Sequence, residues 1–305
     1  NASTWYLGGD YGYLLKTTDG GQSYEKIFVT KTTDKFYACH FIDENTGMVA
    51  GNTDGTIYRT VDGGASWTAI ENSEAGTIYK FSFIDANTGI AVGSSNKWLT
   101  TTDGGASWQL MANQADKTGY AVYMKDANTI IAGSSGSTAN MVVSSDAGAT
   151  WNLFSLGTKK VKEIAFKDDN IGVIVTEGGH AYYTSTGGLT ADAWAEATLP
   201  TEQKINGVTV DAEGNFVLSG YANSDGNFGL TNAIMVSSDN GATWTDITAD
   251  EPEYNPVRLN GIISAGTKTI AFGAFQLVYT HDAPLPDAPA VFFSEYIEGS
   301  SNNKA

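Results

Sequence analysis

The sequence predicts an all-β protein, and specifically a seven-bladed β-propeller of four-stranded blades. Three observations lead to this prediction. A short turn motif recurs along the chain, its copies are about 42 residues apart, and each interval has room for four short strands. The 305 residues also contain 35 glycines but only six prolines, a composition that suits short strands joined by tight turns.

The turn motif is clearest in the first half of the chain. It reads TVDGGASW at residues 60–67 and TTDGGASW at residues 101–108. Other copies are TTDGGQSY at 17–24, SSDAGATW at 144–151, SSDNGATW at 237–244, and two degenerate ones at 184–188 and 280–282. The third position of successive copies falls at residues 19, 62, 103, 146, 186, 239 and 282. This regularity predicts one such turn in every blade.

A second motif keeps the same spacing. FIDENTG at residues 41–47 matches FIDANTG at residues 83–89, with weaker copies in the next three repeats. Each copy is typical of a strand end followed by a turn rich in Asp, Asn and Gly. One repeat therefore predicts four strands, which in the second repeat lie near residues 36–43, 47–52, 55–61 and 66–71.

The aspartate of the first motif is expected to stabilise its turn. Its carboxylate can accept hydrogen bonds from nearby backbone N–H groups, and the glycine two positions later can adopt a positive φ. The aspartates in this position are Asp19, Asp62, Asp103, Asp146 and Asp239. The aromatic residue that closes the motif is expected to pack against the sheet. It is a tryptophan in four copies, namely Trp67, Trp108, Trp151 and Trp244.

These segments resemble the Asp-box, or bacterial neuraminidase, repeat. The combination of the two motifs is most similar to the photosystem II stability/assembly factor-like propellers, over roughly residues 5–283. The resemblance implies the propeller fold, with the boxes on the face away from any ligand, so the five aspartates are interpreted as structural. It does not choose a function, because Asp boxes occur in sialidases, xyloglucan-cleaving glycosidases, receptor ectodomains and non-catalytic scaffolds.

The predicted domain organisation is a propeller over residues 1–283, a proline-rich linker over 284–290 and a tail over 291–305. Two interpretations of the tail remain open. It is either a strand that completes the last blade, or the truncated start of a following β-sandwich, since it resembles the opening strand of a bacterial lamin-tail domain. The second interpretation makes the chain part of a longer multidomain protein.

The net charge of −17 argues against nucleic acid as a partner, because a nucleic-acid binder needs a concentrated basic surface. No run of about 18 apolar residues is present, so no membrane span is expected. The single cysteine, Cys39, lies in an apolar run and is expected to be buried. We expect an extracellular or cell-surface location in a bacterium, or the periplasm.

The sequence offers little support for catalysis. A sialidase grips its substrate with three arginines, whereas this chain has two, Arg59 and Arg258. No enzyme activity is therefore expected. A glycoside hydrolase that uses rim carboxylates remains the alternative, because acidic residues are abundant and a catalytic pair cannot be recognised by counting.

Aromatic residues near the loops between second and third strands are the candidates for binding. They are Tyr11, Trp98 and Tyr221, joined by Asp225 and Phe228 from the insertion at residues 221–232. Such side chains could contact a protein or glycan partner, and packing between blades is the alternative interpretation. Asn223, Asp225 and Asn227 resemble a calcium loop but lack its bidentate glutamate, so an ordinary turn is favoured and no cofactor is expected. Together these features predict a non-catalytic binding module of a secreted or cell-surface protein.

Overall fold

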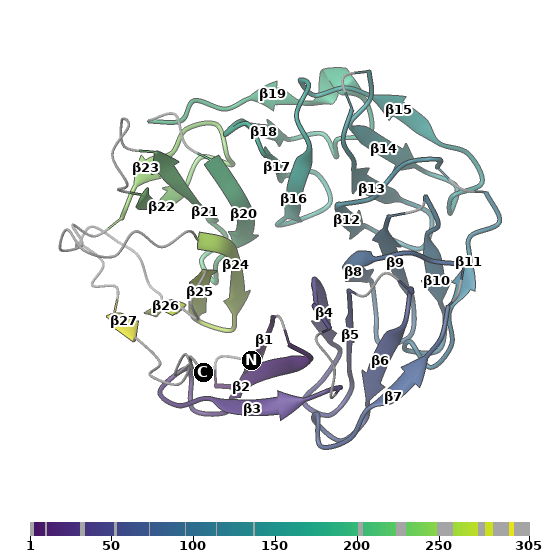
Figure 1. Cartoon of the computed structure of the whole chain (residues 1–305). Coiled ribbons are helices and arrows are strands. Elements are labelled where there is room, and N and C mark those ends of the chain that lie inside the picture. Colours follow the sequence, from purple (N-terminus) through teal and green to yellow (C-terminus); the bar gives the residue numbers. More distant parts are fainter. Residues whose placement is uncertain are drawn as a thin grey trace. The chain divides into compact units, whose positions relative to one another are not determined.

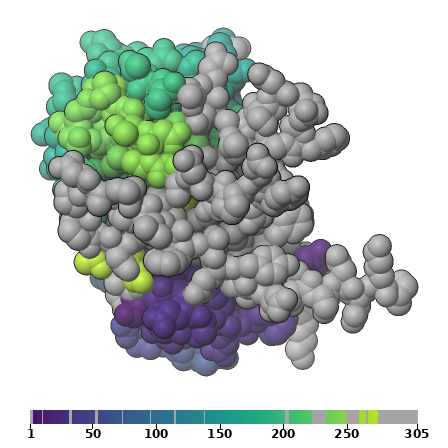
Figure 2. All heavy atoms as spheres, turned by 90° about the vertical axis from the view of Figure 1, so that its left-hand side faces the viewer, coloured from purple at the N-terminus to yellow at the C-terminus, as the bar shows by residue number. Residues whose placement is uncertain are grey.

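A computed structural model describes most of the chain. The described residues are 3–9, 11–30, 34–51, 54–72, 74–94, 96–113, 115–136, 138–200, 204–223, 230–248, 259–273, 278–282 and 293–295. Figure 2 draws these residues in sequence colours and all others in grey. Within the described part, no helix is long and apolar enough to cross a membrane.

The chain divides into two compact units. The first unit comprises Asn1–Ile164 and Thr186–Trp194, and the second comprises Ala165–Ser185 and Ala195–Ala305. The only helix among the described residues is the short 3-10 helix η1 (Ala191–Ala193). All other regular elements are strands (Figure 1).

The first four sheets lie in the first unit and use its strands in chain order. The three-stranded sheet consists of β1 (Trp5–Gly8), β2 (Tyr13–Thr17) and β3 (Glu25–Phe28). The next is β4 (Ala38–Phe41), β5 (Gly47–Ala50), β6 (Ile57–Thr60) and β7 (Thr68–Ile70). It is followed by β8 (Ile78–Phe83), β9 (Gly89–Gly93), β10 (Leu99–Thr101) and β11 (Gln109–Leu110). The fourth is β12 (Ala121–Met124), β13 (Ile130–Gly133), β14 (Met141–Ser144) and β15 (Asn152–Phe154).

Three further sheets follow, each with four strands. The first is β16 (Val161–Phe166), β17 (Gly172–Thr176), β18 (Ala181–Thr184) and β19 (Ala195–Glu196). The second is β20 (Lys204–Val210), β21 (Phe216–Asn223), β22 (Leu230–Ser237) and β23 (Thr245–Asp246). The last is β24 (Leu259–Ala265), β25 (Lys268–Gly273), β26 (Val278–Asp282) and β27 (Phe293–Glu295).

Each sheet is a meander in which consecutive strands lie side by side, the form of a propeller blade. The protein is thus an all-β β-propeller with four-stranded blades, as predicted. The predicted count of seven such blades is wrong, because six sheets are four-stranded and the first has only three strands. The tail does not supply the missing strand, since β27 pairs with β26 in the last sheet.

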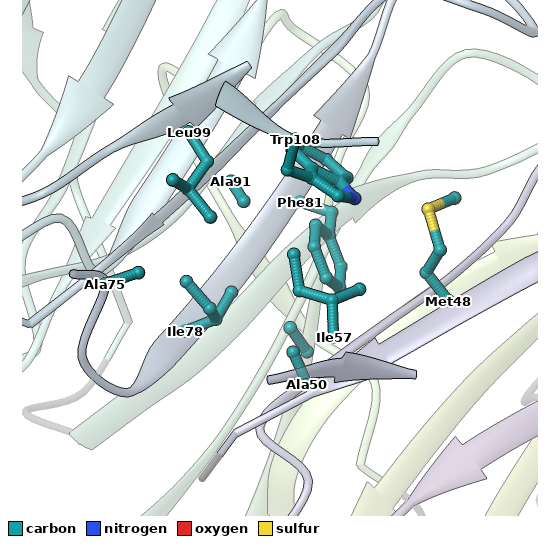
Figure 3. Packing of buried hydrophobic residues seen from close by; sticks show 10 residues of the cluster. Met48, Ala50, Ile57, Ala75, Ile78, Phe81, Ala91, Leu99 and Trp108 are labelled. Atoms are coloured by element: carbon teal, nitrogen blue, oxygen red, sulfur yellow. The ribbon is translucent and has the colours of Figure 1, made fainter. Parts of the chain in front are cut away.

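The core lies between the sheets and follows from the alternation of apolar side chains. In the first unit, Met48 and Ile57 from one sheet pack with Phe81 and Trp108 from the next. Figure 3 shows these side chains converging, and the rings of Phe81 and Trp108 lie 5.6 Å apart. Burial of such large side chains is the main stabilising contribution to a sheet-on-sheet fold.

The turn between the third and fourth strands of a blade has the same hydrogen bonds in five repeats. In the third repeat, the Thr101 hydroxyl donates to Asp103 Oδ1 at 2.8 Å, and Ser107 donates to the same carboxylate through its backbone N–H and its hydroxyl. Asp19, Asp62, Asp146 and Asp239 accept equivalent bonds. Bonds from the Ser107 hydroxyl and N–H lower the pKa of Asp103 to about 2, and Asp62 has a similar value. A general acid needs the opposite shift.

The second glycine of this turn is required by its backbone and by its neighbour. Gly105 has a φ of +75°, and a Cβ there would lie 2.2 Å from Met48 Sδ in the adjacent sheet. Similarly, a Cβ on Gly148 would lie 2.2 Å from Met111 Cε. The first glycine is replaceable, since Ala147 and Asn240 occupy its place with positive φ. Close packing therefore fixes one glycine and leaves the other free to vary.

The tryptophans of the turn motif differ in burial. Trp108 and Trp244 are buried, whereas Trp67 and Trp151 are partly exposed. Cys39 is exposed, contrary to expectation. The apolar run around it is a strand buried on one side, so Phe36 and Ala38 point into the core while Tyr37 and Cys39 point away.

Candidate functional site

The structure places the predicted binding residues in different environments. Tyr11 is 67% exposed, with a φ of +68°, in the loop between β1 and β2. Trp98 is 1% exposed, and its Nε1 donates to the Lys117 carbonyl at 3.0 Å. Tyr221 is buried too, with Lys204 Nζ 5.7 Å from its ring centroid. Packing thus accounts for Trp98 and Tyr221, whereas Tyr11 keeps a surface that a partner could contact.

The remaining candidates lie outside the described residues. These are Asp225, Phe228 and Asn227, while Asn223 is described only as the end of β21. Binding and calcium coordination in this segment therefore stay predictions. Among the residues that are described, no group of three or more His, Cys, Asp or Glu side chains could hold a metal ion.

A different set of side chains forms a continuous surface in the first unit. Tyr37, Tyr79 and Tyr120 come from three successive repeats and lie where the chain enters the first strand of each blade. The ring centroids of Tyr37 and Tyr79 are 5.7 Å apart at an interplanar angle of 63°. Those of Tyr79 and Tyr120 are 5.2 Å apart at 23°. We call these three residues the tyrosine ladder.

The ladder is partly open to solvent. Tyr37 is 55% exposed, and the other two tyrosines are half-buried. Burial, and then the neighbouring Tyr120 and Tyr37, raise the pKa of Tyr79 above its usual value. The Tyr79 phenol therefore keeps its proton at neutral pH and can donate a hydrogen bond.

Glycines at the ends of second strands allow the chain to pass close to the ladder. A Cβ on Gly51 would lie 2.1 Å from the Lys35 carbonyl oxygen, and one on Gly93 would lie 2.0 Å from that of Thr77. Backbone hydrogen bonds then hold two of the tyrosines, from Tyr37 N to the Ala50 carbonyl at 3.0 Å and from Tyr120 N to the Gly133 carbonyl at 2.8 Å. The backbone thus fixes the positions of Tyr37 and Tyr120.

Lys160 extends the ladder at the Tyr120 end, with its Nζ 4.7 Å from the centroid of that ring. The loop that carries Lys160 is held by Asn140, which is fully buried. The Asn140 amide donates to the carbonyls of Leu156 and Lys159, each at 2.8 Å, and accepts from the Leu156 N–H. A cation above an aromatic ring at the end of a rigid loop is a pre-positioned positive charge.

An ion pair lies one residue further along the strands. Lys80, next to Tyr79, contacts Glu163 at 2.5 Å. His40 stacks on Phe83 at 4.7 Å, and burial together with the charge of Lys80 lowers its pKa to about 4. These groups neutralise one another or stay uncharged at neutral pH, so the ion pair is a structural feature.

Sequence reasoning missed the ladder, although a signal was present. Tyr37, Tyr79 and Tyr120 each stand four residues before the first residue of the second motif, which is Phe41, Phe83 or Met124. The binding residues predicted from the sequence all lie in or beside the loops between second and third strands. A residue that recurs at one place outside the core was the signal that could have identified this surface.

Comparison with known proteins gives one family. The model of the family described as photosynthesis system II assembly factor YCF48 matches residues 64–231. A curated relative, the photosystem II assembly lipoprotein Ycf48 of Synechococcus sp. (strain CC9902), is 34% identical over 74 residues. That alignment covers 24% of this chain and 22% of the relative, so the match spans about a fifth of the relative's length.

Solved structures show the same fold. One is titled YCF48 bound to D1 peptide, with a TM-score of 0.73 and 18% identity, covering 93% of this chain and 89% of that one. Another is the GH74 xyloglucanase from Xanthomonas campestris, with a TM-score of 0.73 and 13% identity, covering 96% of this chain and 52% of that one. At such identities these likenesses establish the propeller fold alone.

These findings correct two predictions. The expected binding module of a secreted or cell-surface protein, with a glycoside hydrolase as its alternative, is wrong, because the matching family is that of a photosystem II assembly factor. The expected extracellular, cell-surface or periplasmic location is wrong for the same reason, since the curated relative is a photosystem II assembly lipoprotein. Both errors came from the repeat motif, which specifies a fold that many functions share.

Proposed function

Because the chain belongs to the photosynthesis system II assembly factor YCF48 family, we propose that it is a non-enzymatic assembly factor that binds a segment of another protein. The observation that carries this proposal is the family match over residues 64–231. The similar structure titled YCF48 bound to D1 peptide supports a peptide as the bound segment.

The absence of catalysis is part of the proposal and has a physical basis. The acidic residues that recur are engaged in the turns, where hydrogen bonds hold their carboxylates in the ionised form. We propose that these are Asp-box turns with a structural role, and that Asp19, Asp62, Asp103, Asp146 and Asp239 take no part in chemistry.

The surface that binds the partner is proposed to lie where the chain enters the blades. Tyr11, which lies instead in the loop between β1 and β2, is a second exposed candidate for contact with the partner. The division into a propeller over residues 1–283, a linker over 284–290 and a tail over 291–305 is kept as a proposal, in which β27 serves as a closing strand. The proposed contact surface belongs to the propeller.

Binding can be tested with the purified chain and a set of fluorescently labelled peptides that tile the D1 sequence. We expect at least one peptide to bind saturably with a Kd of micromolar order, and an unlabelled copy to compete. Binding of every peptide equally, or of none up to about 1 mM, would contradict the proposal. The net charge of −17 makes a salt series the proper control for unspecific attraction of basic peptides.

A further inference from the structure

We propose that the tyrosine ladder and Lys160 form a binding site for an extended, proline-containing peptide with a carboxylate at its Lys160 end. The inference deepens the proposed function, since it assumes that the chain binds a peptide, and it names the surface and the class of segment. All the residues that carry it belong to the first unit, so the site is complete there.

The ladder and Lys160 follow one another at similar separations. Successive separations of 5.7, 5.2 and 4.7 Å lead from Tyr37 through Tyr79 and Tyr120 to the Lys160 ammonium. An extended chain advances about 3.3 Å per residue, so a strip of this length accommodates about five residues. Tyr79 and Tyr120 stack on each other and Lys160 lies over the ring of Tyr120, so the exposed ring of Tyr37 is the aromatic face that the ladder offers, beside the hydroxyl groups of the other two tyrosines.

A polyproline II segment has the chemistry that matches such a strip. A polyproline II segment has no internal hydrogen bonds, so its carbonyls are free to accept from phenol hydroxyls while its proline rings pack on aromatic faces. Aromatic-lined surfaces that bind proline-rich segments use this combination. Tyr79 supplies a protonated hydroxyl, and the exposed ring of Tyr37 supplies a face.

Lys160 places a positive charge at one end of the ladder on an otherwise acidic protein. The chain as a whole is strongly acidic, with a net charge of −17, and would repel an acidic peptide over most of its surface. Lys159, Lys160 and Lys162 form its densest basic run, and Lys160 lies at one end of the ladder. A carboxylate on the peptide is therefore attracted to that end, which sets the direction in which the peptide lies.

The side chains of the proposed site are already held in place by their neighbours. The tyrosine rings contact one another, and Asn140 fixes the loop that carries Lys160. Side chains held in this way lose little conformational freedom on binding, which is a main cost of association.

The test uses the whole chain and a synthetic, N-terminally labelled peptide with four prolines followed by one glutamate and an amidated C-terminus. Two matched peptides replace the glutamate with glutamine, one amidated and one with a free C-terminal carboxylate. Binding is measured by fluorescence anisotropy. We expect Tyr79→Ala and Tyr120→Ala to weaken binding of the glutamate peptide at least about tenfold.

Further variants separate the rings from the charge. Lys160→Gln should weaken binding of the glutamate peptide about tenfold and leave the amidated glutamine peptide unchanged. The glutamine peptide with a free C-terminal carboxylate tests whether the charge must come from a side chain. If this peptide binds as tightly as the glutamate peptide, and if Lys160→Gln weakens its binding too, a terminal carboxylate is an equally good source of the negative charge. Phe28→Ala is the matched control, because Phe28 is also exposed, at 65%, but lies on β3 away from the ladder residues in sequence.

The outcomes distinguish this inference from the proposed function. If D1 peptides bind and Tyr79→Ala behaves like Phe28→Ala, the ladder is not the site although the function stands. If the proline peptides bind through the ladder and no D1 peptide binds, the site stands and the assembly function fails. Binding of an oligosaccharide in place of every peptide, or self-association that Tyr79→Ala abolishes, overturns the inference. Urea unfolding of each variant confirms that it is folded.

Discussion

The two ends of a blade use repeated residues in different ways. At the turn between third and fourth strands, the repeated aspartates bind their own backbone and hydroxyl neighbours, and a repeated glycine lies against the adjacent sheet. Where the chain enters the first strand, the repeated tyrosines contact one another and remain partly exposed. Repetition alone is therefore no sign of function. What matters is whether the side chain is already used by the fold.

The largest effect should come from the core near the turn. Trp108→Ala should lower the free energy of unfolding by about 3–5 kcal/mol, because Trp108 is buried against Phe81 and Phe83. Urea unfolding measures the loss. Trp67→Ala is the comparison, and since Trp67 is partly exposed, its loss should be at least about 1 kcal/mol smaller. Equal losses would contradict the role of burial.

A smaller loss of stability is expected when Asn140, which holds the loop that carries Lys160, is replaced. Asn140→Ala leaves the Leu156 N–H and two carbonyls without their partner, which should cost about 2–3 kcal/mol. It should also weaken peptide binding, because the loop that carries Lys160 is no longer fixed. Asn113→Ala is the control, since Asn113 is exposed and its amide makes one bond of 3.2 Å. An Asn140 variant as stable as the control would remove this support for the site.

The turn carboxylates should make the free energy of unfolding fall at acidic pH. Hydrogen bonds lower the pKa of Asp103 to about 2, below the value of about 3.9 for an unfolded chain. The stabilisation of the folded protein by the ionised Asp103 carboxylate is therefore complete above about pH 4 and is lost as the pH falls through about 2. Asp103→Asn should lose about 1 kcal/mol at pH 7 and show a flatter decline in acid. Parallel declines for wild type and variant in urea unfolding would contradict this assignment.

The smallest effect on stability is expected at the exposed end of the ladder. Tyr37→Ala should cost about 0.5 kcal/mol, because the ring is 55% exposed and makes one edge contact with Tyr79. The same variant should still weaken binding of the proline peptide. A stability loss near that of Trp108→Ala would place Tyr37 among the core residues and remove the contrast between the two ends.

Sequence reasoning recovered the features that local chemistry determines. The strands, the turns and the four-stranded blade follow from alternation and from the spacing of glycine and aspartate. The sequence leaves the role of the tail open between two interpretations, because it does not show that the tail pairs with β26. For Trp98 the sequence left binding and packing between blades both open, because its position near a loop did not show that the Trp151 ring packs against it at 5.1 Å. The recurrence of Tyr37, Tyr79 and Tyr120 was visible in the sequence, but the contacts between their rings were not.

The rigid backbone at the entry to each blade has a consequence for how such proteins diverge. Gly51 and Gly93 fix the path of the chain, so the side chain four residues before the second motif can change without disturbing the fold. In the fifth repeat this place is taken by Lys162 in place of tyrosine. Each of these repeats thus contributes one exchangeable side chain to this surface, and a point mutation can change one of them at a time. A propeller of this kind can acquire a new binding partner while the residues that stabilise its fold stay unchanged.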